Sequence, residues 1–177
     1  MNYFEIADYN PIRQDFKFPI IYKNVRIYKP EEILSDNMLD LMATNGLQVR
    51  AVQLFTTRPF SAIEIHVDGD NNINRDPVGA LNYIHGATGL MKWYDPLDGS
   101  ALIKATEVGT VYTVYDPKKC VEIDSLAITK LTLVKIFTPH NVINDSDVYR
   151  YCVSIRFNTN SFDFLREKLS SISWNNL

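Results

Sequence analysis

The residues best suited to chemistry are His66 and Asp68, in the run Ile65-His66-Val67-Asp68-Gly69. Apolar and polar residues alternate here as in a β-strand, where residues two apart point to one face with Cα atoms ~6.6 Å apart. We therefore expect an imidazole and a carboxylate to point at one place, with Val67 pointing the other way. One more histidine would complete the two-histidine, one-carboxylate ligand set of non-haem Fe(II) sites. A His-x-Asp pair also arises by chance, so an ordinary polar strand is the alternative interpretation.

The third candidate ligand is His140. It follows a strongly apolar run, Leu131–Thr138, which we predict to be a strand, and it comes directly after Pro139. At the rim of a β-barrel such a histidine can reach inward and complete a metal site, and the alternative is an exposed loop histidine. The remaining histidine, His85, precedes Gly86 at a predicted strand end, and we interpret it as a surface or hydrogen-bonded residue.

The strand predicted over Arg150–Phe157 carries polar groups on one face only. Strand alternation puts four such side chains together: Arg150, Cys152, Ser154 and Arg156. The opposite face is entirely apolar. An antiparallel sheet with one wet side would give the same pattern. A guanidinium beside a metal site, however, is well suited to bidentate binding of a carboxylate.

Together these features have a fixed order along the chain: His-x-Asp, then Met91-Lys92-Trp93-Tyr94, a late histidine, and an arginine ten positions after it. In this order the sequence resembles the Fe(II)- and 2-oxoglutarate-dependent dioxygenase superfamily, which contains the prolyl and aspartyl/asparaginyl hydroxylases. The resemblance covers Leu47–Phe157. It implies a mainly β fold with flanking helices, namely a double-stranded β-helix (jelly roll, cupin-like). It also implies a hydroxylase that uses Fe(II) and the cosubstrate 2-oxoglutarate.

The resemblance also implies roles for individual residues. The catalytic Fe(II) ligands would be His66, Asp68 and His140. Arg150 would bind the distal carboxylate of 2-oxoglutarate. Arg156 is the rival anchor, but about 20 Å of extended strand separates the two arginines. We therefore expect only one of them to hold the small diacid.

Two further positions belong to the implied cosubstrate pocket. Many relatives carry a serine two residues after the anchoring arginine, whereas this chain has Cys152 there and Ser154 two positions further on. Asn82 lies on the strand after the His-x-Asp loop, where relatives often place a side chain of the same pocket. Trp93 and Tyr94 are interpreted as aromatic core residues, with a wall of the substrate cleft as the alternative.

The remaining pattern predicts a helix, a β-rich body and a second helix. Pro30–Thr44 has helix-start residues, an apolar stripe and Gly46 as a left-handed stop. A final helix is predicted from Ser161. Seven strands are expected between them, separated by turn residues: Leu47–Thr56, Ala62–Asp68, Gly79–His85, Met91–Tyr94, Val108–Tyr115, Leu131–Thr138 and Arg150–Phe157. We expect one domain over 1–177, with an N-terminal segment (1–46), a jelly-roll core (47–157) and a C-terminal helix (158–177).

The composition limits the function classes. The 177 residues are 46% hydrophobic and 22% charged, as in ordinary globular proteins, and the net charge of -3 argues against a dedicated nucleic-acid-coating protein. The two cysteines, Cys120 and Cys152, lie far apart, which indicates a reducing compartment. The start lacks a secretory signal, and no apolar run reaches the roughly 18–20 residues of a membrane span. We expect a cytoplasmic protein without a membrane partner.

The substrate stays open at this stage: a small molecule, a protein side chain or a nucleobase. Two other functions also remain. One is a metal-binding cupin-like protein, non-catalytic or with different chemistry, in which Arg150 binds another anion. The other is a jelly-roll structural or interaction protein, in which His66, Asp68 and His140 do not converge.

Overall fold

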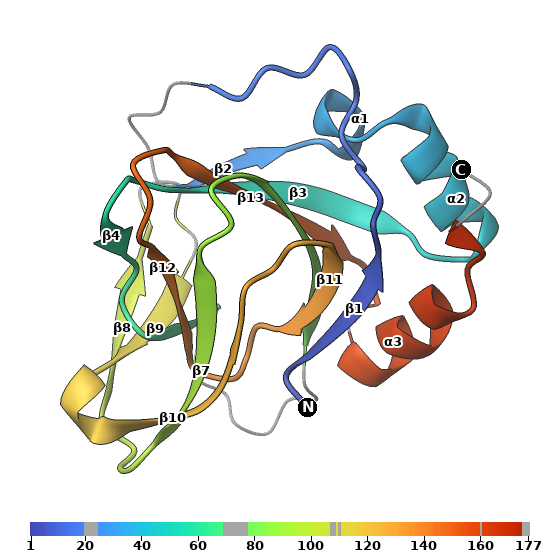
Figure 1. Cartoon of the computed structure of the whole chain (residues 1–177). Coiled ribbons are helices and arrows are strands. Elements are labelled where there is room, and N and C mark those ends of the chain that lie inside the picture. Colours follow the sequence, from blue (N-terminus) through green and yellow to red (C-terminus); the bar gives the residue numbers. More distant parts are fainter. Residues whose placement is uncertain (20–24, 69–77, 107–108, 110, 160, 175–177) are drawn as a thin grey trace.

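The structure, a computed structural model, describes residues 1–19, 25–68, 78–106, 109, 111–159 and 161–174. The fold is mainly antiparallel β, with 49% of these described residues in strands and 17% in helices. Two sheets curve around a common interior, and the helices lie to one side of them (Figure 1). Within the described ranges, no helix has the length and apolar character needed to cross a membrane.

The strands form a six-stranded and a seven-stranded sheet. The first sheet runs in the order β1 (Tyr3–Ala7), β11 (Leu131–Lys135), β6 (Gly79–Gly86), β13 (Arg150–Phe157), β3 (Val49–Thr57) and β2 (Val25–Tyr28). The second runs in the order β10 (Cys120–Leu126), β7 (Leu90–Pro96), β12 (His140–Asn144), β5 (His66–Asp68), β9 (Val111–Tyr115) and β8 (Ala101–Ala105), with β4 (Ser61–Ala62) beside β12. Residues of both sheets line the same cavities, so the two sheets face each other.

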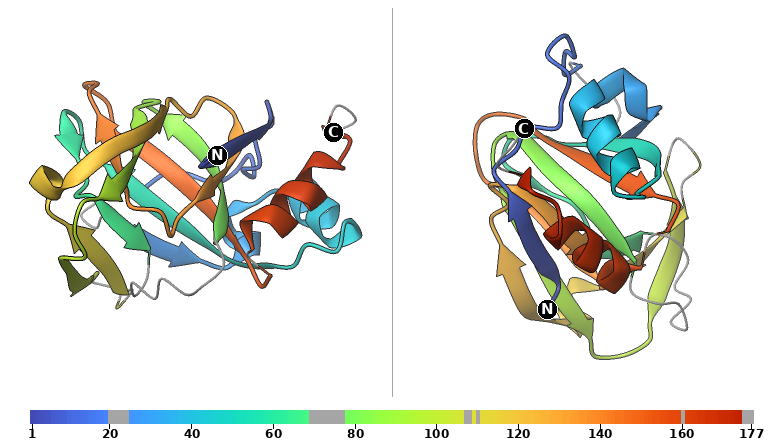
Figure 2. Two further views of the ribbon diagram at one scale, coloured as in Figure 1. Left: turned by 90° about the horizontal axis from the view of Figure 1, so that it is seen from below. Right: turned by 90° about the vertical axis from the view of Figure 1, so that its right-hand side faces the viewer.

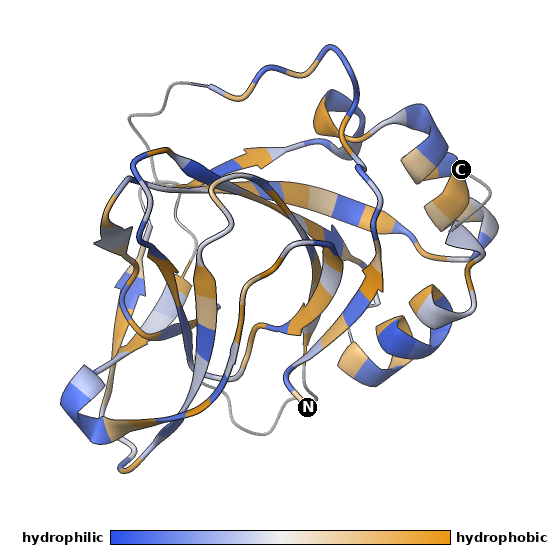
Figure 3. Cartoon of the chain, in the orientation of Figure 1, coloured by the Kyte–Doolittle hydropathy of each residue, from blue (hydrophilic) through white to orange (hydrophobic). Residues whose placement is uncertain are grey.

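The main hydrophobic core lies between the first sheet and the helices α1 (Pro30–Ile33), α2 (Asp36–Thr44) and α3 (Phe162–Ser170). Figure 2 shows the helices against the outer side of this sheet. Each of the two longer helices carries hydrophobic and hydrophilic residues, as Figure 3 shows, and their buried apolar residues pack with those of the strands. Apolar packing on this outer face leaves the inner face of the sheet free for polar side chains.

The helix predicted over Pro30–Thr44 is two helices, which corrects the sequence-based expectation. Leu34 is extended (ψ 148°) and ends α1, and Ser35 caps α2 because its Oγ accepts a hydrogen bond from Met38 N at 3.2 Å. Serine is a favoured N-cap because its side chain satisfies a free backbone N–H group. The predicted apolar stripe is confirmed in the core, and Gly46 has the expected left-handed φ of +70°.

The predicted strand Ala62–Asp68 is interrupted, and its two parts, β4 and β5, both pair with β12. Ala62 lies opposite Ile143 and His66 opposite His140. Four steps along one strand (62 to 66) therefore face three along the other (143 to 140), which is the mark of a β-bulge. The extra residue sets the register of β5, so that His66 faces His140.

The other strand predictions differ from the structure mainly at their ends. The strand predicted to run to Thr138 ends at Lys135, and the start of Val108–Tyr115 falls outside the described residues. The prediction missed β1, β2, β8, β10 and β12. The first four are the outermost strands of the two sheets. Edge strands are partly wet on both faces, so their sequences lack the clear alternation of half-buried strands.

Candidate metal centre

His66, Asp68 and His140 converge on one place between the two sheets. Because His66 and His140 are directly opposed in the antiparallel pair β5–β12, their side chains lie on the same face. Asp68 joins them because it is two residues further along β5. One nitrogen or oxygen atom from each side chain lies within 4.8 Å of the others, and the three groups could hold a metal ion.

The position of His140 differs from the sequence-based expectation. It does not follow the end of a strand but begins β12, a strand that the sequence analysis took for a loop. Its neighbours across the sheet are His66 on one side and Trp93 on the other. A central strand holds its side chains more rigidly than a loop, so His140 is fixed by the ladder on both sides.

Backbone carbonyl groups orient both imidazoles. Nδ1 of His66 lies 2.8 Å from Glu64 O, and Nδ1 of His140 lies 2.9 Å from Thr138 O. A carbonyl oxygen only accepts hydrogen bonds, so each Nδ1 carries the proton and donates it. Each Nε2 then keeps its lone pair for a ligand. Histidines that bind metals are usually held in this way through their other nitrogen.

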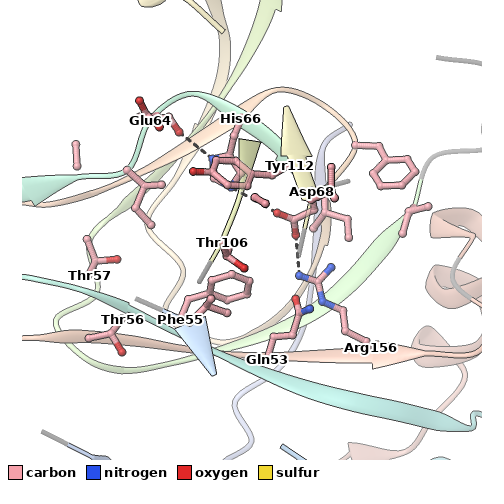
Figure 4. A pocket seen from close by; sticks show the side chains of 18 of the residues that line it. Gln53, Phe55, Thr56, Thr57, Glu64, His66, Asp68, Thr106, Tyr112 and Arg156 are labelled. Carbon is pink, nitrogen blue, oxygen red and sulfur yellow. Dashed lines mark hydrogen bonds and ion pairs between the residues drawn. The ribbon is translucent and has the colours of Figure 1, made fainter. Parts of the chain in front are cut away.

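Asp68 is held from two sides (Figure 4). Its Oδ2 accepts a hydrogen bond from Arg156 Nη2 at 2.7 Å, and its Oδ1 lies 3.5 Å from His66 Nε2. Arg156 is 7% exposed. The guanidinium therefore fixes one carboxylate oxygen and leaves the other beside the histidines, where a metal ligand would be needed.

The charge states of Asp68 and His140 suit a cation, whereas the raised pKa of His66 means that a metal would have to displace a proton there. Burial and the nearby His66 charge lower the pKa of His140 to about 4, so it is neutral at pH 7. Burial raises the pKa of Asp68, but the charge of Arg156 and the His66 hydrogen bond outweigh it and hold that pKa well below its usual range. Burial lowers the pKa of His66, and the hydrogen bond and charge of Asp68 reverse this to a net increase. A neutral imidazole and an ionised carboxylate are the forms that bind metals.

An inner cavity of about 40 Å³ brings the predicted site residues together. All of the residues assigned to the metal or the cosubstrate line it: His66, Asp68, Asn82, His140, Arg150, Ser154 and Arg156. The alternation predicted for β13 places its polar face toward this cavity, while Val153, Ile155 and Phe157 pack in the core under the helices. Asn82 lies directly beside Ser154 in the β6–β13 pair, and its Oδ1 is buried without a hydrogen-bond partner.

Arg150 is a buried cation, 2% exposed, in the wall of this cavity. Its Nε donates a hydrogen bond to Thr88 O at 2.8 Å. Among the described residues, no carboxylate oxygen lies within 4.0 Å of its guanidinium nitrogens. Burial lowers the pKa of Arg150 from its ordinary value. A buried charge without a counter-charge is costly, so this group is suited to an anionic ligand.

Both arginines of β13 line the inner cavity, although about 20 Å of strand separates their Cα atoms. That only one of them holds the small diacid therefore stays a prediction. Their partners differ, however. Arg156 is bonded to Asp68, whereas Arg150 has no carboxylate partner in the described part of the chain. Arg150 is thus the arginine of β13 whose charge no described carboxylate compensates.

A second, outer cavity of about 810 Å³ lies next to the first. The residues that line both cavities include the metal candidates of β5 and their partner on β13: Phe55, Ile63, His66, Asp68, Ile136 and Arg156. His66 and Asp68 thus lie between a small cavity and a larger one. The larger cavity has room for a substrate beside these two side chains.

The outer cavity contains residues that the sequence analysis did not select, among them Arg50, Gln53, Thr57 and Tyr112. The available signal was the polar run Thr56-Thr57-Arg58 after an apolar strand. The aromatic interpretation of Trp93 is confirmed, because its ring is fully buried and stacks on Tyr3 at 5.6 Å.

His85 lies away from the triad. Its ring stacks on Phe18, with 4.1 Å between the centroids, and it lines neither the inner nor the outer cavity.

Comparison of the chain with protein-family models and with curated protein sequences finds no match.

Proposed function

We propose that this protein is an Fe(II)- and 2-oxoglutarate-dependent oxygenase that hydroxylates its substrate at the triad. The donor set supports Fe(II): two imidazole nitrogens and one carboxylate oxygen are the ligands of the facial triad found in such enzymes. The three residues fit the ion because their donor atoms lie within 4.8 Å of one another and hydrogen bonds orient each of them.

The observation that carries the proposal is Arg150. A metal site alone does not require a buried guanidinium in the wall of the same cavity. A diacid cosubstrate does, because a bidentate ion pair with its distal carboxylate would compensate the buried charge. Arg150 and Ser154 line the inner cavity with the triad, and both can donate hydrogen bonds. These two donors support a small, polar, negatively charged ligand.

The order of the strands supports the double-stranded β-helix. Eight strands, taken in chain order, form the frame: β3, β5, β6, β7, β10, β11, β12 and β13. The first of them pairs with the last, the second with the seventh, the third with the sixth and the fourth with the fifth. This is the pairing of one long hairpin wound upon itself into two facing sheets, which is how a jelly roll is built.

The chain's own residues would have distinct tasks. Fe(II), 2-oxoglutarate and O₂ together supply the oxidising chemistry, in which the cosubstrate leaves as succinate and CO₂ and the substrate gains a hydroxyl group. Arg150 binds and orients the cosubstrate. Arg156 holds Asp68 in place. The apolar walls of the inner cavity, among them Met91 and Val142, keep water away from the reacting groups.

Anaerobic titration with Fe(II) and 2-oxoglutarate tests this proposal. We expect a weak visible charge-transfer band that appears only when both are present. The Arg150→Ala variant should retain the metal and lose the band at the same cosubstrate concentration, and Asp68→Ala should lose both. Metal binding with no response to 2-oxoglutarate would instead favour a cupin-like metal protein of different chemistry. Failure of the wild-type protein to bind a metal would leave a structural or interaction protein.

A further inference from the structure

The outer cavity is not uniform in charge along β3. Figure 4 shows Gln53 and Arg156 together at one end, and Thr57 with Glu64 toward the other. Arg50 also lines this cavity. Arg156 pairs with Ala51, the residue next to Arg50 in β3. The end of the cavity that contains Gln53 and Arg156 is therefore named the Arg50 end.

A β-bulge brings Arg50 to this place. Phe157 pairs with Val49 and Arg156 with Ala51, so Arg50 is the extra residue of β3. Regular alternation would put it on the face of Val52, which is buried in the core under the helices. Bulges redirect side chains in this way and are common beside active sites. The exposed side chain of Arg50 therefore lies along the outer cavity.

The Arg50 end also holds an unused hydrogen-bond donor. Nε of Arg156 is buried and has no partner, while Nη2 of the same guanidinium is bonded to Asp68. The residue is 93% buried and lines the outer cavity. A buried N–H group without a partner costs about 1–3 kcal/mol. A ligand with acceptor atoms would remove that cost.

Among the described residues, no carboxylate neutralises the charge of Arg50. Two acidic side chains line the outer cavity in the described part of the chain, Asp68 and Glu64. Asp68 is bonded to Arg156, and Glu64 is bonded to Lys104 Nζ at 2.7 Å at the other end of the cavity. No described carboxylate lies within 4.0 Å of the Arg50 guanidinium. The Arg50 end is therefore positive and rich in donors.

We infer that the substrate of this protein is an anion whose carboxylate or phosphate group binds at Arg50, next to Arg156 and Gln53. This inference rests on the proposed function, because it places the anionic group beside the metal and the reacting carbon within the same cavity. Arg50 supplies the charge-assisted hydrogen bonds. The side-chain amide of Gln53 supplies a neutral donor to the same group, and the unpaired Nε of Arg156 supplies a buried one.

The test uses probe pairs in which one member carries the anionic group and the other a neutral group in its place. The Zn(II)-loaded protein, saturated with 2-oxoglutarate so that the inner cavity is filled, is titrated by nuclear magnetic resonance. The carboxylate pair is N-acetylaspartate amide and N-acetylasparagine amide, and the phosphate pair is glycerol 3-phosphate and glycerol. We expect the charged member of at least one pair to bind about 10-fold more tightly than its neutral counterpart, as for a charge-assisted hydrogen bond. The pair that shows the larger ratio identifies the anionic group.

Arg58→Gln is the matched control for Arg50→Gln. Both arginines are exposed, both line the outer cavity, and both variants change the net charge by the same amount, but Arg58 follows the opposite end of β3. We expect Arg50→Gln to weaken binding of the anion about 10-fold, Arg50→Lys to recover part of the loss, and Arg58→Gln to leave the affinity within twofold. Equal losses in the two glutamine variants, or no preference for the charged probes, would overturn the inference.

The two proposals can fail separately. Binding of Zn(II) and 2-oxoglutarate is measured in the same samples before any probe is added. If both bind but the charged probes show no preference, only the anionic substrate is wrong. If neither binds, the oxygenase is wrong, and the same titration of the metal-free protein still decides whether the Arg50 end binds anions.

Discussion

Arg156 Nη2 donates a hydrogen bond to Asp68 Oδ2 at 2.7 Å, although the two residues are 88 positions apart in the chain. The bond connects β13, in the first sheet, to β5, the strand of the second sheet that carries the His-x-Asp pair. It also leaves Asp68 Oδ1 on the side of His66. An arginine that the sequence analysis treated as a rival anchor for 2-oxoglutarate therefore holds a candidate metal ligand in position.

Arg156→Gln should weaken metal binding about 10- to 100-fold, which is the usual effect of removing a hydrogen-bond partner of a metal ligand. In the metal-free protein it should also lower the free energy of unfolding by about 1.5–3 kcal/mol, because the half-buried Asp68 loses its hydrogen bond to a charged group. Added metal should restore part of that loss, since the cation compensates the same carboxylate. Calorimetry and denaturant unfolding with and without Zn(II) measure both effects. A loss of stability that metal leaves unchanged would show that the ion pair is structural only.

Replacing Arg150 should weaken binding of the cosubstrate but stabilise the protein when no cosubstrate is present. Arg150→Ala should weaken 2-oxoglutarate binding at least ~100-fold, and Arg150→Lys should recover only part, because an ammonium lacks the planar fork. Without cosubstrate, Arg150→Met should raise the free energy of unfolding by about 1–3 kcal/mol, because a buried charge is removed. Calorimetry on the Zn(II)-loaded protein and denaturant unfolding test the two effects. Destabilisation of the ligand-free protein by Arg150→Met would mean that the guanidinium already has a compensating partner.

Each of the variants His66→Ala, Asp68→Ala and His140→Ala should abolish tight binding of Fe(II), Zn(II) or Ni(II). The reason is that two remaining ligands hold a divalent cation far less tightly than three. His85→Ala is the matched control, because His85 stacks on Phe18 outside the triad and should leave the metal content unchanged. Metal content after dialysis, with circular dichroism to confirm folding, measures the effect. Retained metal in the first three variants, or lost metal in the control, would disprove the assignment.

Gly89→Ala should disturb Arg150 far more than an ordinary glycine substitution. Gly89 has a φ of +60°, and an added Cβ would lie 2.5 Å from Ile143 O and 2.8 Å from Arg150 Cδ. Gly46→Ala is the control, with a φ of +70° and no atom within 4 Å of the added Cβ. The control should cost about 1–2 kcal/mol of unfolding free energy for the left-handed backbone alone. Gly89→Ala should cost clearly more and also weaken 2-oxoglutarate binding. Equal costs, with unchanged cosubstrate affinity, would contradict the close packing of Gly89 on Arg150.

Local patterns were sufficient for part of the site. Strand alternation correctly placed Arg150, Cys152, Ser154 and Arg156 on one face of β13, and the His-x-Asp spacing placed His66 and Asp68 on one side of β5. The apolar stripe of the first helical segment was also correct, although a cap at Ser35 divides that segment in two. These predictions hold because the direction of a side chain along a helix or strand depends on backbone geometry that repeats every few residues.

Partners across the sheets could not be predicted in the same way. The sequence by itself determined which side chains share a face of one strand: His66 with Asp68, and Arg150 with Arg156. Only the tertiary structure decided that a bulge sets His66 opposite His140, that Arg156 bonds to Asp68, and that a second bulge turns Arg50 into the outer cavity. The physical reason is that register depends on hydrogen bonds between strands far apart in the chain, and a shift of one residue reverses every side chain that follows it.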